Sequence, residues 1–553
     1  MRLTGAEILI ECLKEQDVDT VFGIPGGTVL NIFDELYKHS AEVRNILTSH
    51  EQGASHAADG YARATGKVGV CIATSGPGAT NTVTGIATAY MDSIPIVVIT
   101  GNVAVPLLGK DSFQEIDIAG VTMPITKHNF IVKDVNNLAD IVRRAFYIAQ
   151  EGRPGPVLID IPKDVTIHSA EYVAQKPREI VKVSEVSKED IELAVEMIKN
   201  AKRPFIYSGG GVVFSDATAE LTEFARKIYS PVAASMMGLG GFPGNDDLFT
   251  GMIGMHGTKA SNIAVTKCDL LIAVGVRFSD RVISRADRFA PAAKIIHIDI
   301  DPAEINKNIK TDHHIVGDVK SVLKQLNKSV KPKEKGAWYD EVMKIKNVHP
   351  LKYKQDEVLR PQYIIERIYD LTKGEALIAT EVGQNQIWAA QFYKYTKPRT
   401  FISSCGLGTM GYGTGAAIGA QIGRPDKKVF NIAGDGSFRM NCNELATAVF
   451  YKTPIIIAVM NNGTLGMVRQ WQRLFYEERF SETTLDRGPD FVKLAEAYGA
   501  TGFRVTEKAD VDVVLKKALA ADGPVVIDFA LDIDEKVLPM VPPGDALDKL
   551  ITE

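Results

Sequence analysis

The sequence predicts an α/β protein of three domains, each a mostly parallel sheet flanked by helices. Short β-branched runs alternate with amphipathic stretches along the chain, among them VGVCIAT, PIVVITG, LLIAVGV, KIIHIDI, KVFNIAG and PIIIAVM. Apolar strands separated by helical segments are typical of parallel sheets that are covered on both faces. The chain has 553 residues, and at ~150 residues per domain it is too long for a single small module.

Two polar stretches divide the chain into three blocks. They are residues 170–189 and 327–341, each rich in Lys and Glu with a proline and few apolar positions. The predicted domains are residues 1–170, 186–328 and 355–553.

A weak internal repeat relates the two outer blocks. Residues 87–100 (ATAYMDSIPIVVIT) match 446–460 (ATAVFYKTPIIIAVM), and 155–160 (GPVLID) match 523–528 (GPVVID). Two matched pairs in the same order and at similar spacing favour a duplicated domain over chance likeness.

Polar residues of the first block come after two strand-like runs. Glu51 comes after RNILTS and opens an Ala-rich helix, and the loop TSGPGATN (74–81) comes after VGVCIA. A glycine-rich loop at a helix start suits an anion or a flat heterocycle. A carboxylate in a first helical turn is as commonly a partner of the helix dipole as a functional group, so Glu51 alone decides nothing.

The middle block carries SGGGV, GMHGT, GVRFSDRV, HIDID and GDV. Glycines after one strand and acidic residues at the ends of later strands are typical of a site that binds a dinucleotide, or of a domain that has lost such a site. A structural domain with ordinary turns is the alternative. We expect His313 and His314 to be a solvated loop pair.

The strongest local signal is GDGSF (434–438) together with MNNGTLGM (460–467). Both come directly after apolar strands, at the edge where open α/β sheets bind ligands. Asp435, Asn462 and a main-chain carbonyl at the Gly463-Thr464 turn would make a partial oxygen cage for Mg²⁺, which leaves its other positions to phosphate and water. Two ordinary turns are the alternative. GLGTMG (406–411) is a weak dinucleotide match, and we prefer a backbone approach to another ligand or simple helix packing.

Composition excludes several classes. The formal charge of -5 gives no basic face for nucleic acid, and the five cysteines form no CxxC pair. Residues 1–16 resemble an amphipathic helix more than a signal peptide, and no apolar stretch reaches the ~20 residues of a spanning helix. We expect a soluble cytoplasmic protein that binds neither nucleic acid nor a membrane.

The motifs together resemble a known family. GDG and NN stand 461 − 434 = 27 positions apart, similar to the thiamine-diphosphate signature of the pyruvate decarboxylase and oxidase superfamily. GIPGGTVL, SHEQGA, SFQEID, GMHGT, RFSDRV, GLGTMGYG, GMVRQWQ and VLPMVPPG resemble the large catalytic subunits of acetohydroxyacid synthase, also called acetolactate synthase. The resemblance implies a thiamine-diphosphate-binding fold with an N-terminal pyrimidine-binding, a central FAD-binding-like and a C-terminal diphosphate and Mg-binding domain.

The resemblance implies roles for individual residues. Glu51 would share a proton with the aminopyrimidine, and Met410 would support the bent cofactor. The implied contacts of thiamine diphosphate are Glu51, Gly26, Pro77, Gly383, Gln384, Gly408, Met410, Gly434, Gly436, Ser437 and Met467. The implied Mg²⁺ ligands are Asp435, Asn462 and Thr464.

The resemblance also implies substrate and flavin residues. Gln114, Phe113, Lys163 and Trp471 would surround the reacting 2-ketoacids, with Trp471 favouring 2-ketobutyrate as acceptor. FAD, which has no net redox role in the family reaction, would contact Arg153, Gly210, His256, Arg277, Asp280, Asp299 and Asp318. The chain departs from the family at Ser279, Asn102 and Asn385, where Asp, often Gln and often His are usual.

The implied reaction is decarboxylation of pyruvate and its joining to pyruvate or 2-ketobutyrate, at the entry to branched-chain amino acids. A flavin-dependent pyruvate oxidase, a catabolic acetolactate synthase and a degenerate scaffold subunit are the alternatives. In the family the cofactor lies between two chains, so we expect a homodimer or homotetramer, with a small regulatory subunit as a further partner.

Overall fold

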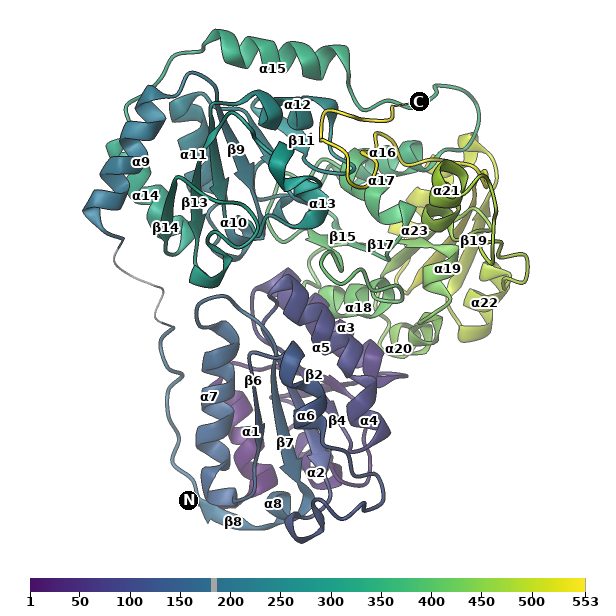
Figure 1. Cartoon of the computed structure of the whole chain (residues 1–553). Coiled ribbons are helices and arrows are strands. Elements are labelled where there is room, and N and C mark those ends of the chain that lie inside the picture. Colours follow the sequence, from purple (N-terminus) through teal and green to yellow (C-terminus); the bar gives the residue numbers. More distant parts are fainter. Residues whose placement is uncertain (181–185, 553) are drawn as a thin grey trace.

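The structure is a computed structural model that describes residues 1–180 and 186–552. It holds three six-stranded parallel sheets with helices on both faces (Figure 1). Each sheet is buried on both sides: Val97 and Ile99 of one strand belong to one core cluster, and Ile96 and Val98 to another. Successive side chains of a strand point to opposite faces, so burial of both faces explains the continuous apolar runs. The predicted α/β fold is confirmed.

The first sheet has the strand order β3-β2-β4-β5-β7-β6. Its strands are β2 (Thr20–Gly23), β3 (Arg44–Leu47), β4 (Gly69–Ala73), β5 (Ile96–Asn102), β6 (His128–Ile131) and β7 (Val157–Pro162). Its helices are α1 (Gly5–Glu15), α2 (Leu30–Lys38), α3 (Glu51–Thr65), α4 (Pro77–Asn81), α5 (Val83–Asp92), α6 (Ile118–Thr122), α7 (Leu138–Gln150) and α8 (Lys163–Ile167). The amphipathic N-terminal helix is confirmed as α1, which begins with a capping box between Thr4 and Glu7.

The third sheet repeats the first. Its order is β16-β15-β17-β18-β20-β19, the same permutation of six consecutive strands. The strands are β15 (Leu377–Thr380), β16 (Phe401–Ile402), β17 (Val429–Gly434), β18 (Ile456–Asn461), β19 (Thr501–Val505) and β20 (Val525–Ala530). The helices are α16 (Pro361–Thr372), α17 (Gln384–Phe392), α18 (Gly413–Gly423), α19 (Asp435–Phe438), α20 (Leu445–Phe450), α21 (Gly466–Phe475), α22 (Phe491–Tyr498) and α23 (Val511–Leu519).

The duplication extends to a buried side-chain pair. Asn102 at the end of β5 donates to Asp160 on β7 at 2.6 Å, and Asn461 at the end of β18 donates to Asp528 on β20 at 2.8 Å. Both pairs have the same register, because the residue two positions before each Asn lies opposite the Asp. The sequence matches that suggested a repeat therefore occupy equivalent strands, and the departure at Asn102 belongs to a repeated structural pair.

The middle sheet has a different order, β11-β10-β9-β12-β13-β14. Its strands are β9 (Pro204–Ser208), β10 (Val232–Ala234), β11 (Phe249–Met252), β12 (Leu270–Val274), β13 (Lys294–Asp299) and β14 (His313–Val316). Its helices are α9 (Lys188–Asn200), α10 (Gly210–Phe214), α11 (Thr218–Ile228), α12 (Lys259–Lys267), α13 (Asp280–Ile283) and α14 (Val319–Ser329). In sequence terms the order is 3-2-1-4-5-6, which is the order of dinucleotide-binding folds.

Three expectations about the connections and this block need correction. Residues 169–171 form β8 (Ser169–Glu171), which pairs with β1 (Arg2–Thr4), so the first polar stretch begins inside a strand; its residues 181–185 lie outside the described residues. The second stretch contains the start of α15 (Ala337–Val348), where Trp338 is buried and its Nε1 donates to Pro204 O. His313 is buried in β14 and its Nε2 contacts Asp190 O, so it is not in a solvated loop. The domain limits 1–170, 186–328 and 355–553 stay predictions.

Helices α3 and α18, which are equivalent in the repeat, pack together between the outer blocks (Figure 1). A Cβ atom at Gly419 would lie 1.8 Å from Ala57 O, so only glycine permits this approach. Among residues 1–180 and 186–552, no helix is long and apolar enough to cross a membrane.

Candidate active site

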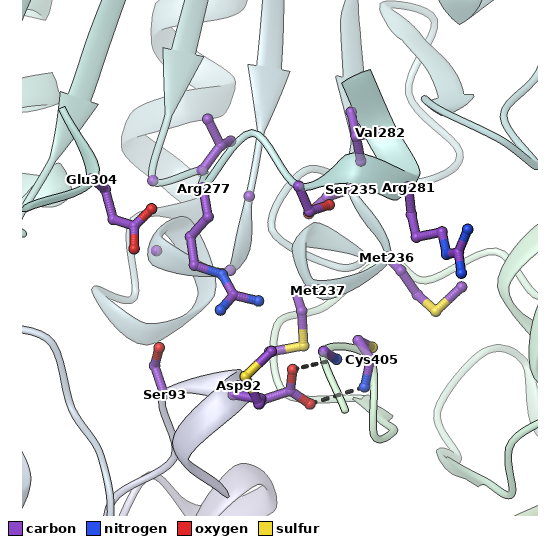
Figure 2. Close-up of a pocket in the computed structure, with 18 of the residues that line it drawn as sticks. Asp92, Ser93, Ser235, Met236, Met237, Arg277, Arg281, Val282, Glu304 and Cys405 are labelled. Carbon is purple, nitrogen blue, oxygen red and sulfur yellow. Dashed lines mark hydrogen bonds between the residues drawn. The ribbon is translucent and has the colours of Figure 1, made fainter. Parts of the chain in front are cut away.

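A cavity of about 930 Å³ lies where the three blocks meet. The first block contributes α5 and the turn after α7, the third block the loop after β16 and helix α21, and the middle block the carboxyl ends of its strands. Figure 2 shows Arg277 pointing into this cavity from the middle block, with Asp92 and Ser93 on the side of the first block. This cavity therefore lies at the edge of a parallel sheet where α/β proteins bind ligands.

All seven residues predicted to contact FAD line this cavity: Arg153, Gly210, His256, Arg277, Asp280, Asp299 and Asp318. A Cβ at Gly209, the residue before α10, would lie 2.1 Å from Gly275 O, so the loops after β9 and β12 touch without side chains between them. No ion pair joins Arg277 to a carboxylate within the described residues. This guanidinium is therefore available to an anion.

The acidic flavin candidates differ in how they are used. Asp318 caps α14 through Ser321 and accepts from Ser215 Oγ at 2.7 Å, so both of its oxygens serve the fold. Asp280 is exposed at the start of α13. Burial raises the pKa of Asp299 to about 7, and its Oδ1 accepts from Asp301 N. Asp299 therefore keeps its Oδ2 for a ligand, with His297 Nε2 3.8 Å away, and the exposed Asp280 also has oxygens available.

Arg153 bridges two blocks. Its Nε donates to Ser93 Oγ at 2.8 Å and its NH1 to Glu304 Oε1 at 2.7 Å, across the cavity wall. Glu304 lines the cavity as well, although no sequence motif pointed to it.

Ser279, one of the departures, is the residue before α13 and makes no capping bond with its side chain. Burial lowers the pKa of His256, which also lines the cavity, to about 4, and its Nδ1 contacts Pro539 O.

Asp435 and Asn462 come directly after the neighbouring strands β17 and β18, in which Gly434 pairs with Met460. Burial raises the pKa of Asp435 to about 7, and no salt bridge pairs it with a cation within the described residues. Asn462 uses its Nδ2 to donate to Gln384 Oε1 at 3.1 Å, which leaves its Oδ1. Carboxylate and amide oxygens are the ligand types that Mg²⁺ takes.

The turn after Asn462 is held by a short antiparallel bridge. Leu465 N donates to Thr483 O and Leu485 N donates to Gly463 O, so the Thr464 carbonyl stands outside this ladder. The Thr464 hydroxyl donates to Thr483 O at 2.7 Å, which ties the side chain to this bridge and leaves the main-chain carbonyl as the predicted metal ligand.

The glycine-rich loop 406–411 lies against the same region. A Cβ at Gly436 would lie 3.9 Å from Met410 Cε, and a Cβ at Gly434 would lie 3.1 Å from Asn385 Oδ1. Asn385, the third departure, donates to Glu381 O and Ile432 O. Ser437 is buried in α19 and donates to Gly434 O. Gly383, Gly408, Met467 and Trp471 line the large cavity, which thus reaches this edge of the third sheet.

Asp92 anchors that loop, although no sequence motif predicted this role. Its carboxylate accepts from Cys405 N at 2.9 Å and Gly406 N at 2.7 Å, as the dashed lines in Figure 2 show. Arg63 of α3 donates to the same carboxylate at 2.9 Å. The preferred interpretation of the loop, a backbone approach or packing, fits better than a dinucleotide fingerprint, because Asp426 lies in an exposed turn paired with Arg424.

Glu51 is the first residue of α3, and Asn81 Nδ2 donates to its Oε2 at 3.0 Å. Gly78 of the 74–81 loop lies close to the other oxygen, because a Cβ atom at this position would be 3.3 Å from Glu51 Oε1. Glycine has no side chain to crowd Oε1, so this oxygen stays accessible. Gly26 packs on Thr74. Gln114 packs on Gly76, and both residues have a φ of 59°. These residues gather at one edge of the first sheet.

The structure does not bring all the predicted site residues together in one place. Within the described residues, no hydrogen bond or salt bridge joins Glu51 to Asp435 or Asn462, and Glu51 does not line the large cavity. Phe113 is 88% exposed, and Pro77 and Lys163 are exposed on the surface of the first block. The single chain therefore presents two separate groups of candidates, one on each outer block.

Comparison with known proteins assigns the family. Three domain models of thiamine pyrophosphate enzymes match: the N-terminal TPP binding domain at residues 3–121, the central domain at 191–326 and the C-terminal TPP binding domain at 381–529. The chain is 48% identical to an acetolactate synthase of Mycobacterium leprae, over 99% of this chain and 90% of that protein. It is 49% identical to an acetolactate synthase large subunit of Corynebacterium glutamicum (99% and 89%) and 46% identical to a probable one of Methanocaldococcus jannaschii (99% and 95%). The chain therefore belongs to the thiamine pyrophosphate enzymes and, among them, to the family of acetolactate synthase large subunits.

Proposed function

We propose that this chain is an acetolactate synthase that joins pyruvate to a second 2-ketoacid. The products are 2-acetolactate from two molecules of pyruvate and 2-aceto-2-hydroxybutyrate from pyruvate and 2-ketobutyrate, at the entry to branched-chain amino acids. The observation that carries the proposal is the near full-length similarity to acetolactate synthases together with both groups of site residues.

Thiamine diphosphate and Mg²⁺ fit the residues present. Asp435, the Asn462 amide oxygen and the Thr464 carbonyl form a set of hard oxygen donors around a buried carboxylate that has no cation of its own among the described residues. When bound, thiamine diphosphate supplies the electron sink for loss of carbon dioxide. The chain's part is to hold the diphosphate through the metal, to exclude water, and to keep Glu51 Oε1 open while Asn81 holds Oε2, so that one carboxylate oxygen takes and returns a proton.

FAD fits the middle block. The cavity lies at the carboxyl edge of a sheet in the order of dinucleotide-binding folds, and among the described residues it offers a guanidinium without an acidic partner. Arg277 would hold the diphosphate part, and Arg153, Gly210, His256, Asp280, Asp299 and Asp318 would form the walls.

Replacing Arg277 by Ala should reduce the flavin that the purified protein retains, because a charge-assisted contact to phosphate contributes ~1.5–3 kcal/mol, equivalent to about 10- to 100-fold in affinity. The measurement is flavin released on denaturation after equilibrium dialysis against FAD. Arg281→Ala is the matched control, since this neighbour also lines the cavity but is 65% exposed beside Asp280. Equal loss in both variants would remove Arg277 from the flavin site.

A homodimer completes the site. Glu51 and Asp435 have no contact in one chain, so we propose that the first block of one copy faces the third block of another, with a tetramer as the higher state. A small regulatory subunit is proposed as a further partner, because relatives of this chain, among them those of Corynebacterium glutamicum and Methanocaldococcus jannaschii, carry the name large subunit. The five free cysteines suit the proposed cytoplasmic location.

The test of the function is the product formed from pyruvate with thiamine diphosphate, Mg²⁺ and FAD, with oxygen uptake measured in the same vessel. Acetolactate without matching oxygen loss is expected. Acetate or acetyl phosphate with matching oxygen loss would instead identify a flavin-dependent pyruvate oxidase, and no product at all would indicate a degenerate subunit.

Replacing Trp471 by Leu should lower the preference for 2-ketobutyrate by about 10-fold, because the extra methyl of that acceptor is worth only ~1–3 kcal/mol of contact. Trp471 lines the cavity from α21 and packs edge-to-face on Phe475. The measurement is the product ratio when both acceptors compete. Tyr476→Leu, at the exposed end of the same helix, is the control. An unchanged ratio for Trp471→Leu would exclude it as the specificity residue.

A further inference from the structure

Three buried amide side chains form one hydrogen-bonded row beside the proposed metal loop. Asn462 Nδ2 donates to Gln384 Oε1 at 3.1 Å, and Gln384 Nε2 donates to Gln470 Oε1 at 3.0 Å. Each of the three side chains is at most 7% exposed. Buried amides need a partner for both ends, so such a row fixes the orientation of each member relative to the next.

The polarity of the row is set by main-chain groups, whose donor and acceptor ends cannot exchange. Val537 N donates to Gln470 Oε1 at 2.9 Å, and Gln470 Nε2 donates to Val537 O at 3.0 Å, so only one orientation of Gln470 is satisfied. Gln384 Nε2 also donates to Glu535 O at 2.8 Å, which fixes that amide in turn. Gln384 Oε1 must then accept, and Asn462 must present its nitrogen to it. The Asn462 oxygen is therefore directed away from the row before any metal binds.

The anchoring main chain belongs to the C-terminal segment, residues 531–552, which comes after β20. This segment continues from Val537 to the wall of the large cavity. His256 Nδ1 donates to Pro539 O at 3.3 Å, and Val541 N donates to Met255 O at 2.8 Å. Met255 and His256 both line that cavity. The hydrogen-bonded row and the main chain from Val537 to Pro539 thus connect Asn462 to the middle block.

We propose that Gln470 is a positioning residue: through Gln384 it turns the Asn462 oxygen towards the metal, and it couples the metal loop to the C-terminal segment. This inference rests on the proposed function, because it takes Asn462 as a Mg²⁺ ligand. Groups that orient a metal ligand typically contribute 10–100-fold to metal affinity.

The first test measures cofactor binding and needs no turnover. Thiamine diphosphate is titrated into the protein at a series of Mg²⁺ concentrations, and binding is measured by calorimetry. Gln470→Leu should raise the Mg²⁺ concentration required by about 10- to 100-fold. Gln421→Leu is the matched control, because within the described residues this equally buried glutamine donates to Arg424 O and Lys427 O alone, and its loss should leave the requirement unchanged. A wild-type requirement in Gln470→Leu overturns the inference, whereas failure of the wild-type protein to bind would overturn the proposed function itself.

The second test separates orientation from general damage. Asn462→Asp presents an oxygen whichever way its side chain turns, so it does not need the row. If Gln470 acts by orienting the amide, Gln470→Leu should raise the Mg²⁺ requirement much less in the Asn462→Asp background than in the wild type. Equal losses in the two backgrounds would overturn the inference.

The third test uses a conservative variant and a structural readout. Gln470→Glu keeps an oxygen that accepts from Val537 N and Gln384 Nε2, and it loses the nitrogen that donates to Val537 O and Met540 Sδ. Its Mg²⁺ requirement should lie closer to that of the wild type than that of Gln470→Leu, and it decides the case if the Leu variant fails to fold. Mg²⁺ with thiamine diphosphate should protect residues 531–552 from proteolysis in the wild type and not in Gln470→Leu; equal protection in both would contradict the coupling.

Discussion

Replacing Glu51 by Gln is expected to abolish most turnover of pyruvate while leaving the fold intact. The amide oxygen of glutamine can still accept the hydrogen bond from Asn81 Nδ2, so the local structure is retained. The amide cannot take and return a proton, and positioned general acid-base groups contribute typically 10²–10⁴-fold to rate. The measurement is kcat from acetolactate, read as acetoin after acid decarboxylation.

The control for this result is Glu42→Gln, a carboxylate that is half exposed in a surface pair with Lys14 and His39 and should leave kcat unchanged. Binding of thiamine diphosphate with Mg²⁺ should persist in Glu51→Gln, because its metal ligands lie on the third block. Full activity of Glu51→Gln would refute the assignment of this residue.

The second large effect is complementation between two inactive variants. Asp435→Ala should also be inactive, because it removes the only carboxylate of the proposed metal site. If each site combines Glu51 of one copy with Asp435 of the other, a mixed dimer of Glu51→Gln and Asp435→Ala contains one site with both wild-type residues. Random assortment in a twofold-symmetric dimer then restores about a quarter of the wild-type activity.

The experiment mixes the purified variants, allows subunit exchange and records activity with time. The double variant Glu51→Gln/Asp435→Ala mixed with inactive Asp435→Ala is the matched control, since no assortment of these chains yields an intact site. No recovery in the test mixture, despite exchange shown by labelled chains, would place both residues in one chain. An active monomer in sedimentation would contradict the dimer as well.

Much of the candidate site could be predicted because its residues stand directly after apolar strands. Asp435 and Asn462 come after β17 and β18, and Glu51 comes after β3 at the start of a helix. In a parallel sheet all strands end at the same edge, so local pattern alone brings such residues to one side. The glycine motifs of the middle block are located by the same rule.

Residues that act across long sequence distances could not be predicted. Gln384 and Gln470 are separated by 86 positions and Gln470 and Val537 by 67, and the row that they form has no periodicity. Asp92 is the last residue of a helix, and its role arises only because the 406–411 loop packs there. Trp338 stands in a polar stretch and is nevertheless buried, because α15 covers the middle block.

The sequence by itself determined the α/β class, the repeat of the outer blocks and the residue types of both half-sites, because these depend on apolar periodicity and on the residues directly after each strand. Only the tertiary structure decided which of these residues meet. It brings the flavin candidates together in one cavity, keeps Glu51 apart from Asp435 within the chain, and orients Asn462 through the main chain of residues 535–537. The physical reason is that hydrogen-bond partners of buried polar groups are set by packing between distant segments, and packing leaves no local trace in the sequence.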